Sequence, residues 1–198
     1  MSELQKFYSE FDMAKWTDYP LHKDSIVFDI GGYKGDWTDK INTLYSPKIY
    51  CFEPIRKHAN GISDRFKNND NITVLPIAIS DENKTDQIYV NQDESSVFFN
   101  KRGGPQKTIQ CQTLDEVMND YNIKNIDLIK INIEGGEYPL LDYMLANNLV
   151  EKCTDISVQF HECIEDYEKR YNNIREGLEK THKLTFRYTY VWENWVKK

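Results

Sequence analysis

A glycine-rich turn near the start of the chain combines residue types that can bind a nucleotide. Asp29, Gly31 and Gly35 form the spacing D-x-G-x-x-x-G between a run of apolar residues and a segment with helical periodicity. Glycine lets the backbone turn sharply and lets a ligand lie against bare peptide, while the N-terminus of the following helix offers unpaired N–H groups to an anion. The turn therefore predicts a ligand site at a strand-to-helix junction.

A second carboxylate is expected beside this turn. Glu53 follows the apolar run 48–52 and lies 24 residues after Asp29. Because neighbouring parallel strands end at the same edge of a sheet, the two acids are expected to meet there, where an open α/β sheet binds its nucleotide. The turn, the helix and Glu53 together favour a sheet that binds a ligand over one that binds nothing.

Two classes of nucleotide use a glycine turn with a ribose-binding acid. A dinucleotide fingerprint G-x-G-x-x-G would need glycine at position 30, where the chain has Ile30. The spacing suits S-adenosylmethionine instead, with Asp29 near the ammonium of its methionine arm and Glu53 accepting both ribose hydroxyls. A nicotinamide-dependent oxidoreductase is thereby disfavoured, and a nucleotide-binding module that has lost catalysis is the other alternative.

The segments that must position these residues alternate short apolar runs with helical periods, which is typical of a parallel sheet covered by helices. The predicted strands span 25–30, 48–52, 71–80, 126–131 and 155–160, and a short ribbon is expected at 87–90 and 107–112. Pro76 fits an edge or a bulge of the third strand. Alternating apolar residues from Leu184 to Tyr190, followed by Trp192 and Trp195, predict a closing hairpin in the core.

Apolar residues at helical spacing predict the helices between these strands. One amphipathic helix is expected over 3–17, with Leu4, Phe7 and Phe11 on its apolar face. A capping box at 113–116 is expected to begin a short helix that turns Tyr121 inward.

Six segments of the chain resemble the FkbM-type methyltransferases, a branch of the S-adenosylmethionine-dependent class I enzymes. They are VFDIGGYKGDWT, CFEP, LPIAIS, TLDEV, IDLIKINIEGGEYPLL and ISVQFHE, and they lie in the family's order between about residues 25 and 163. The segment from Lys130 to Glu137 is similar to the family's lysine, acid, x, Glu-Gly-x-Glu signature. Asn132 stands where the family usually has aspartate, and Gly32-Tyr33 replaces its more usual Ala-Asn.

The resemblance implies an α/β fold with a doubly wound, mostly parallel seven-stranded sheet whose last strand is antiparallel. Residues 1–198 then form a single domain, with 1–22 as an N-terminal helical extension. The implied activity is methyl transfer to a hydroxyl, often of a sugar or a polyketide, with S-adenosylmethionine as cofactor and most simply a saccharide as acceptor. The implied cofactor-binding residues are Asp29, Gly31, Gly32, Tyr33, Gly35, Thr38, Glu53, Pro54, Ala78, Ile79 and Asn132.

A hydroxyl acceptor needs a group that takes its proton, and a positioned base contributes about 10² to 10⁴ in rate. His161 is the predicted base because it follows the strand 155–160 at the carboxyl edge, next to Glu162, which could orient its ring. Glu134 is the rival base or a ligand of the acceptor hydroxyl, and Glu137 is expected to cap the next helix. The other histidines, assigned to loop or helix surfaces, are His22, His58 and His182.

Two further alternatives stay open at this edge of the sheet. The acids, the asparagine and the histidine could hold a divalent cation, but no pair has a spacing that fixes a coordination geometry, so no metal is predicted. The loop SSVFFNKRGG carries Phe98 and Phe99 beside Lys101 and Arg102, and it forms either a lid over the ligands or a small satellite core.

Composition limits the class of protein. The chain of 198 residues has 39% hydrophobic and 29% charged residues, typical of one globular domain. Its net charge of −7 argues against a nucleic-acid partner, and no apolar run reaches the roughly 18 residues that cross a bilayer. The protein is therefore expected in the cytoplasm, with its four cysteines reduced. The pattern does not predict an oligomeric state.

Overall fold

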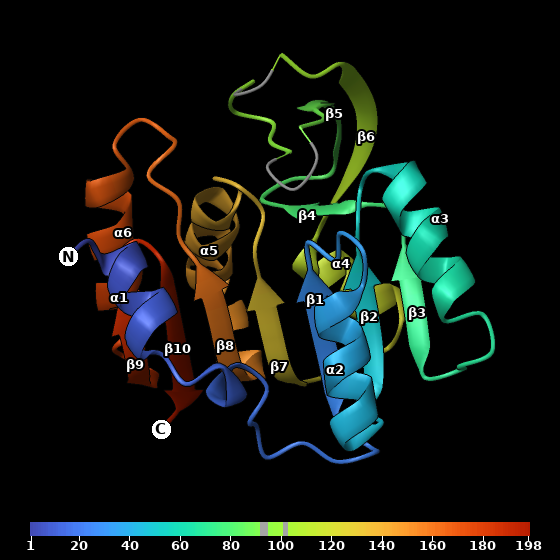
Figure 1. Cartoon of the computed structure of the whole chain (residues 1–198), viewed down its shortest axis with the longest axis horizontal. Coiled ribbons are helices and arrows are strands. Elements are labelled where there is room, and N and C mark those ends of the chain that lie inside the picture. Colours follow the sequence, from blue (N-terminus) through green and yellow to red (C-terminus); the bar gives the residue numbers. More distant parts are fainter. Residues whose placement is uncertain (92–94, 101–102) are drawn as a thin grey trace.

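The computed structural model describes residues 1–91, 95–100 and 103–198. A seven-stranded sheet carries helices on both faces, and a three-stranded sheet lies above the carboxyl ends of its central strands (Figure 1). The strands are β1 (Ile26–Ile30), β2 (Lys48–Phe52), β3 (Ile72–Leu75), β4 (Ala78–Ser80), β5 (Lys84–Tyr89), β6 (Gln106–Thr113), β7 (Ile126–Ile131), β8 (Cys153–Gln159), β9 (His182–Tyr188) and β10 (Trp192–Lys197). The α-helices are α1 (Glu3–Glu10), α2 (Asp36–Tyr45), α3 (Arg56–Arg65), α4 (Leu114–Asp120), α5 (Glu137–Ala146) and α6 (Tyr167–Leu178), and the 3-10 helices are η1 (Met13–Trp16) and η2 (Leu149–Lys152).

The large sheet confirms the expected fold class. Its strand order is β3-β2-β1-β7-β8-β10-β9. Parallel pairing joins β3, β2, β1, β7 and β8, whereas β10 runs antiparallel to both β8 and β9. The final strand of the chain therefore inserts between two earlier ones and closes the predicted hairpin within the sheet.

Chain order reverses beside β1, because β2 and β3 lie on one side of it and β7 and β8 on the other. The register pairs Asp29 of β1 with Cys51 of β2 and with Lys130 of β7. The carboxyl ends of three strands thus open side by side at the reversal, which is the place where open α/β sheets bind ligands.

Side-chain alternation along the strands builds a core on each face of the sheet. Val27 of β1 packs with Trp37 of α2 on one face. Phe28, the next residue, packs on the other face with Leu114 of α4 and Leu141 of α5. Both faces are covered, which explains why the predicted strands read as nearly continuous apolar runs.

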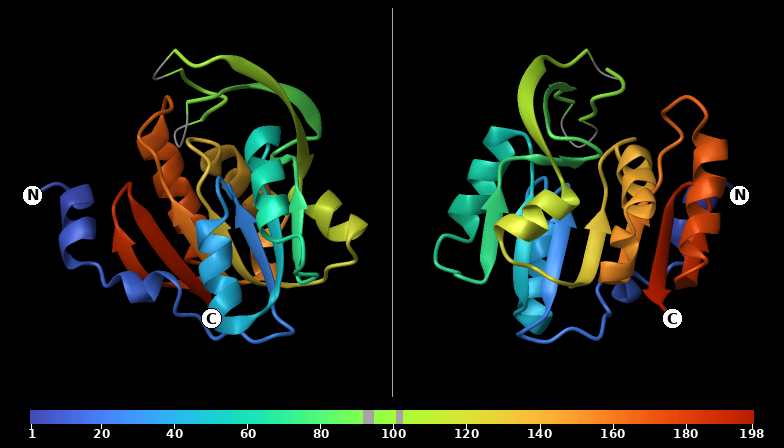
Figure 2. Two further views of the ribbon diagram at one scale, coloured as in Figure 1. Left: turned by 45° about the vertical axis from the view of Figure 1, so that its right-hand side comes forward. Right: turned by 180° about the vertical axis from the view of Figure 1, so that it is seen from behind.

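Residues 71–80, predicted as one strand, form two strands in different sheets. β3 pairs with β2 in the large sheet, and β4 pairs with β6 in the small one. Pro76 lies between them, and it has no N–H with which to continue the ladder. The expected ribbon is confirmed, since β5 pairs antiparallel with β6. The two views of Figure 2 show this small sheet arching over the end of the large one.

The single helix predicted over 3–17 is wrong, because the helical pattern breaks at Phe11. Phe11 is extended (ψ 122°), and the side chain of Asp12 accepts a hydrogen bond from the N–H of Ala14, which starts η1 as a separate turn. Phe7 and Phe11 are buried against rings of the β9–β10 hairpin, while Leu4 stays half exposed.

The capping box predicted at 113–116 does not form. Thr113 makes no side-chain cap, and its N–H donates instead to Asn83 Oδ1 at 2.8 Å. Thr113 is also the last residue of β6, so tertiary pairing holds the start of α4 in place of the local motif. Tyr121, expected inward, is 40% exposed at the end of this helix.

Two observations bear on the class of protein. Among the described residues, no helix combines the length and apolar character needed to span a bilayer. No disulfide joins the four cysteines, all of which belong to the described part of the chain, and Cys51, Cys111 and Cys153 are buried.

Candidate functional site

The backbone of the glycine turn is fixed by the neighbouring strands. The N–H groups of Gly31 and Gly32 both donate to the carbonyl of Phe52 at 3.0 Å. Gly31 has φ +87°, and a Cβ there would lie 2.0 Å from the carbonyl oxygen of Asn132. Only glycine fits this position, so the turn follows directly from the sequence.

Asp29 supports the turn from below and does not line the cavity. Its buried carboxylate accepts hydrogen bonds from Thr38 Oγ1 at 2.6 Å and from Lys130 Nζ at 2.9 Å. Lys130 also donates to the carbonyl of Gly31 at 2.9 Å. The sequence therefore places Asp29 and Thr38 in the right region, and the structure joins their side chains below the turn. The role of Lys130 was missed, although a lysine within a buried strand signals a charged partner.

The Glu53 carboxylate lies beside the glycine turn, directly after β2. Oε2 accepts from the N–H of Tyr33 and Oε1 from the N–H of Ile55, both at 2.9 Å. The side chain is buried, and this burial raises the pKa of Glu53 to about 7 against the effect of the two backbone hydrogen bonds. Both oxygens keep lone pairs, so the group can accept further hydrogen bonds as a carboxylate.

His58 belongs to the site, contrary to the expectation of a surface residue. It lies in the first turn of α3, with its ring edge-on to Tyr33 at 4.9 Å between centroids. Its Nδ1 is 3.9 Å from Glu53 Oε1 and, within the described residues, has no hydrogen-bond partner. Burial and the charges of Lys57 and Lys34 lower the pKa of His58. A histidine in the first turn of the helix that follows a strand-end acid could have signalled this position.

The remaining histidines divide between surface and core. His22 is exposed, as predicted. His182, also predicted at the surface, is buried on β9, where its Nε2 lies 3.0 Å from the carbonyl oxygen of Cys153.

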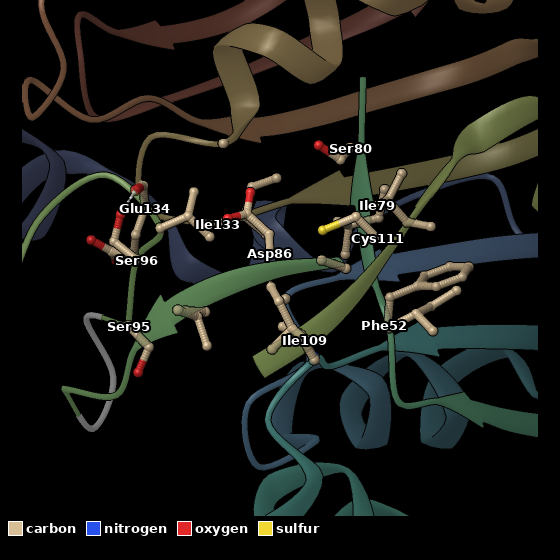
Figure 3. A pocket seen from close by; sticks show the side chains of 18 of the residues that line it. Phe52, Ile79, Ser80, Asp86, Ser95, Ser96, Ile109, Cys111, Ile133 and Glu134 are labelled. Atoms are coloured by element: carbon tan, nitrogen blue, oxygen red, sulfur yellow. Dashed lines mark hydrogen bonds between the residues drawn. The ribbon is translucent and has the colours of Figure 1, made fainter. Parts of the chain in front are cut away.

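A cavity of about 530 Å³ runs from the glycine turn to the underside of the small sheet (Figure 3). Eight of the predicted site residues line it, namely Gly31, Tyr33, Glu53, Pro54, Ala78, Ile79, Asn132 and Glu134. The other five, Asp29, Gly32, Gly35, Thr38 and His161, do not line the cavity. Gly35 instead begins α2 in a left-handed conformation (φ +80°), and a Cβ at Gly32 would lie 2.2 Å from Cys51 Sγ.

Asn132 offers an unused acceptor to this cavity. Its Oδ1 is buried and has no hydrogen-bond partner among the described residues. An unpaired buried carbonyl oxygen is costly, so a ligand donor is the natural partner for it. The exchange of the family's aspartate for asparagine keeps this acceptor.

Glu134 and His161 lie together, with Glu134 at the cavity wall and His161 behind it. The His161 Nε2 is 3.2 Å from Glu134 Oε1, and its Nδ1 is 3.1 Å from Glu137 Oε1. Burial opposes a charge on the ring, but the two glutamates outweigh it and raise the pKa of His161 to about 10. Glu162, expected to orient the ring, contacts the hydroxyl of Tyr167 instead.

The small sheet forms the far wall of the cavity. Ile88 of β5 and Ile109 and Cys111 of β6 line it and belong to one apolar cluster. In the loop between β5 and β6, Ser96 is buried and its hydroxyl donates to the carbonyl of Glu134 at 2.7 Å. Figure 3 shows Ile109 and Cys111 on the side of the cavity opposite Glu134.

The predicted loop SSVFFNKRGG is described in part. Val97 joins the apolar cluster of the small sheet, and the half-exposed Phe98 lines the cavity. Lys101 and Arg102 lie outside the described residues. A lid and a satellite core are both compatible with these contacts, and slower proteolysis of the loop on cofactor binding would identify a lid.

The family model of the methyltransferase FkbM domain matches residues 29–188. A search of curated proteins found no match.

The part of the chain that the structure describes contains no group of three or more histidine, cysteine or acidic side chains arranged to hold a metal ion.

Solved structures with a similar fold share little sequence with the chain. An rRNA methylase from Streptococcus thermophilus has 12% identity and a TM-score of 0.54, with 89% of each chain covered. The fibrillarin pre-rRNA processing protein of Methanococcus jannaschii has 11% identity and a TM-score of 0.54, covering 91% of this chain and 69% of that one. Aeropyrum pernix fibrillarin, solved with bound S-adenosyl-L-methionine, has 11% identity and a TM-score of 0.50, covering 99% and 72%.

Proposed function

The chain belongs to the FkbM family of methyltransferases, whose cofactor is S-adenosylmethionine, and from this premise we propose that it methylates a hydroxyl group, in the first place of a saccharide. One observation carries the proposal. A single cavity joins Glu53 at the end of β2 to Glu134 beyond the end of β7, so a ribose-binding acid and a possible proton acceptor face the same space.

The residues of the turn fit the cofactor. Glu53 would accept hydrogen bonds from the ribose hydroxyls, and the orphan Oδ1 of Asn132 would accept one from the ammonium group. Gly31 keeps the backbone bare where a Cβ would block the turn. Pro54, Ala78 and Ile79 supply an apolar wall for the adenine.

When bound, the cofactor supplies an electrophilic methyl group on a sulfonium and retains the bonding electrons as a neutral thioether. The contribution of the chain is then mainly alignment, which is worth up to roughly 7 to 11 kcal/mol in favourable cases. The acceptor oxygen must also lose its proton, and Glu134 is the carboxylate at the cavity wall that can take it.

His161 was the first candidate for this proton transfer. A base must be unprotonated, whereas a pKa of about 10 keeps the His161 ring charged at neutral pH. The ring also does not line the cavity. We therefore assign the proton-accepting role to Glu134, with His161 acting from behind it.

The lining of the cavity supports a neutral acceptor. Among the described lining residues, Lys84 is paired with Glu82 at 2.9 Å and Arg170 with Asp142 at 2.6 Å, so both cations are already engaged. Asp81 and Glu134 add negative charge. A phosphodiester would meet these carboxylates, and neither cation of the described lining is free to pair with it, which favours a small-molecule or glycan hydroxyl over a nucleic acid.

Labelled methyl transfer tests the function. The protein is incubated with methyl-labelled S-adenosylmethionine and a panel of methyl glycosides, with a structured RNA in a parallel reaction. We expect label in a methyl ether of a glycoside and none in the RNA. Label in the RNA alone would overturn the acceptor class, and calorimetric binding of S-adenosylhomocysteine without turnover on any acceptor would favour the non-catalytic alternative.

The pH dependence of cofactor binding tests Glu53. Its pKa of about 7 means that the carboxylate form that accepts from the ribose is lost as the pH falls below 7. The affinity for S-adenosylhomocysteine should therefore fall by up to about tenfold per pH unit between pH 6.5 and 5.5, and level off above pH 8. Calorimetry at these pH values measures it.

Glu53→Gln is the matched control, because glutamine keeps an acceptor but does not titrate. It should bind more weakly at pH 8 and show a flatter pH dependence. The His58 Nδ1 lies 3.9 Å from Glu53 Oε1, and burial lowers the pKa of His58, so an unchanged slope in Glu53→Gln would assign the effect to His58. An affinity of the wild-type protein that does not vary with pH would contradict the prediction.

A further inference from the structure

Glu137 is a fully buried carboxylate whose contacts exceed those of a helix cap. It is the first residue of α5, and its Oε2 accepts from the N–H of Gly135 at 2.8 Å. Its Oε1 accepts from the backbone N–H of His161 at 2.9 Å and lies 3.1 Å from the ring Nδ1 of the same residue. One carboxylate thus joins the loop after β7 to the segment after β8.

His161 is held at both edges of its ring and at its backbone carbonyl. Glu137 fixes the Nδ1 side, and the hydroxyl of Tyr138 donates to the His161 carbonyl at 3.0 Å. The opposite edge, Nε2, faces Glu134 Oε1 at 3.2 Å without meeting hydrogen-bond geometry. Since the Nδ1 side is already committed to Glu137, the Nε2 proton is available to the carboxylate at the cavity wall.

Glu134 itself has little freedom. Its backbone is left-handed (φ 50°), a conformation that residues other than glycine rarely adopt. Its carbonyl oxygen accepts a hydrogen bond from the Ser96 hydroxyl. The Ser96 hydrogen bond and the His161 ring, 3.2 Å from Oε1, thus fix the direction of the Glu134 side chain.

We propose that Glu137 and His161 are positioning residues, which together hold the Glu134 side chain in place at the cavity wall. The His161 ring stays an imidazolium throughout the reaction. Glu137 orients this ring, and the ring in turn orients the Glu134 side chain. The acid groups that act on the ring are Glu134 on the cavity side and Glu137 on the core side. The role in catalysis rests on the proposed function, but the charge state of the ring does not.

The ring charge is measured by NMR titration of the full chain labelled with ¹⁵N-histidine, with the His161 signals assigned from His161→Gln. In the wild-type protein we expect imidazolium signals to persist through pH 8. Glu137→Gln should move the titration to lower pH by at least about one unit. Glu162→Gln, an exposed neighbour that contacts the Tyr167 hydroxyl, should leave it unchanged.

Either of two results overturns the proposal: a wild-type His161 that titrates near 6.5, or a folded Glu137→Gln protein with an unchanged titration. Glu134→Gln provides the second variant if Glu137→Gln does not fold, because its side chain faces the cavity. It too should move the His161 titration to lower pH, and an unchanged titration would count against the contact.

Kinetics separate positioning from mere packing. With a glycoside that supports turnover, Glu137→Gln and His161→Gln should lower kcat by about 10- to 100-fold, with KM for the acceptor and Kd for S-adenosylhomocysteine within a few fold of wild type. Unchanged kcat in both variants would refute the positioning role. Absence of turnover with every acceptor would count against the proposed function alone, since the titration needs no substrate.

Discussion

Glu134→Gln is expected to lower kcat by about 10² to 10⁴, the range of a positioned base, while the Kd for S-adenosylhomocysteine stays within a few fold of wild type. Glutamine is nearly isosteric and can still accept a hydrogen bond, but it cannot take a proton at neutral pH. Glu134 follows β7 whereas Glu53 directly follows β2, so the substitution leaves Glu53 unchanged. Initial rates with a methyl glycoside that serves as acceptor give kcat, and calorimetry with S-adenosylhomocysteine gives Kd.

Glu162→Gln is the matched control for this variant. It removes the same charge from an exposed residue that does not line the cavity, so its kcat should equal that of the wild-type protein. A Glu134→Gln enzyme that keeps kcat within a few fold would remove Glu134 from the chemistry. If instead only KM rose, the residue would bind the acceptor hydroxyl and leave its proton alone.

The sequence predicted the edge of the sheet at which the site forms. Strand ends can be placed from apolar runs, and a glycine directly after a strand signals a sharp turn, which Gly31 makes with φ +87°. Glu53 was found for a related reason, because a residue directly after a parallel strand must lie at the carboxyl edge. These predictions needed only local pattern and the direction of the chain.

The direction of individual side chains at that edge was less predictable. Asp29 lies near the end of a strand as expected, but its carboxylate is buried, where Lys130 of the adjacent strand contacts it at 2.9 Å. His161 was expected to face the acceptor, and Glu134 and Glu137 enclose its ring instead. Each outcome depends on a partner from a distant part of the chain, and residue spacing along one strand carries no information about it.

The small sheet shows a similar limit. A ribbon at 87–90 and 107–112 was predictable from local alternation, but the transfer of β4 into that sheet was not. Pro76 signalled an interruption, and only the pairing of β4 with β6 shows that the chain leaves the large sheet there. As a result, the far wall of the cavity was missed although each of its strands was foreseen in part.

Gly31→Ala is expected to abolish measurable binding of S-adenosylhomocysteine and to destabilise the fold. Alanine would take a φ of +87°, which costs about 1 to 3 kcal/mol. Its Cβ would also lie 2.0 Å from the Asn132 carbonyl oxygen and 3.1 Å from Ile133 Cγ2, so the end of β7 must move. Overpacking of this kind costs typically about 1 to 3 kcal/mol more. Urea unfolding and calorimetry measure the two effects.

Gly61→Ala separates this effect from the general cost of replacing glycine. Gly61 is exposed within α3, and a Cβ there would meet nothing within 4 Å, so alanine should stabilise the protein by about 0.5 to 1 kcal/mol and leave binding unchanged. Because Asn132 lines the cavity beside Gly31, displacement of β7 would disturb the ligand and the fold together. A Gly31→Ala protein that binds S-adenosylhomocysteine with wild-type affinity would show that the cofactor does not depend on this turn.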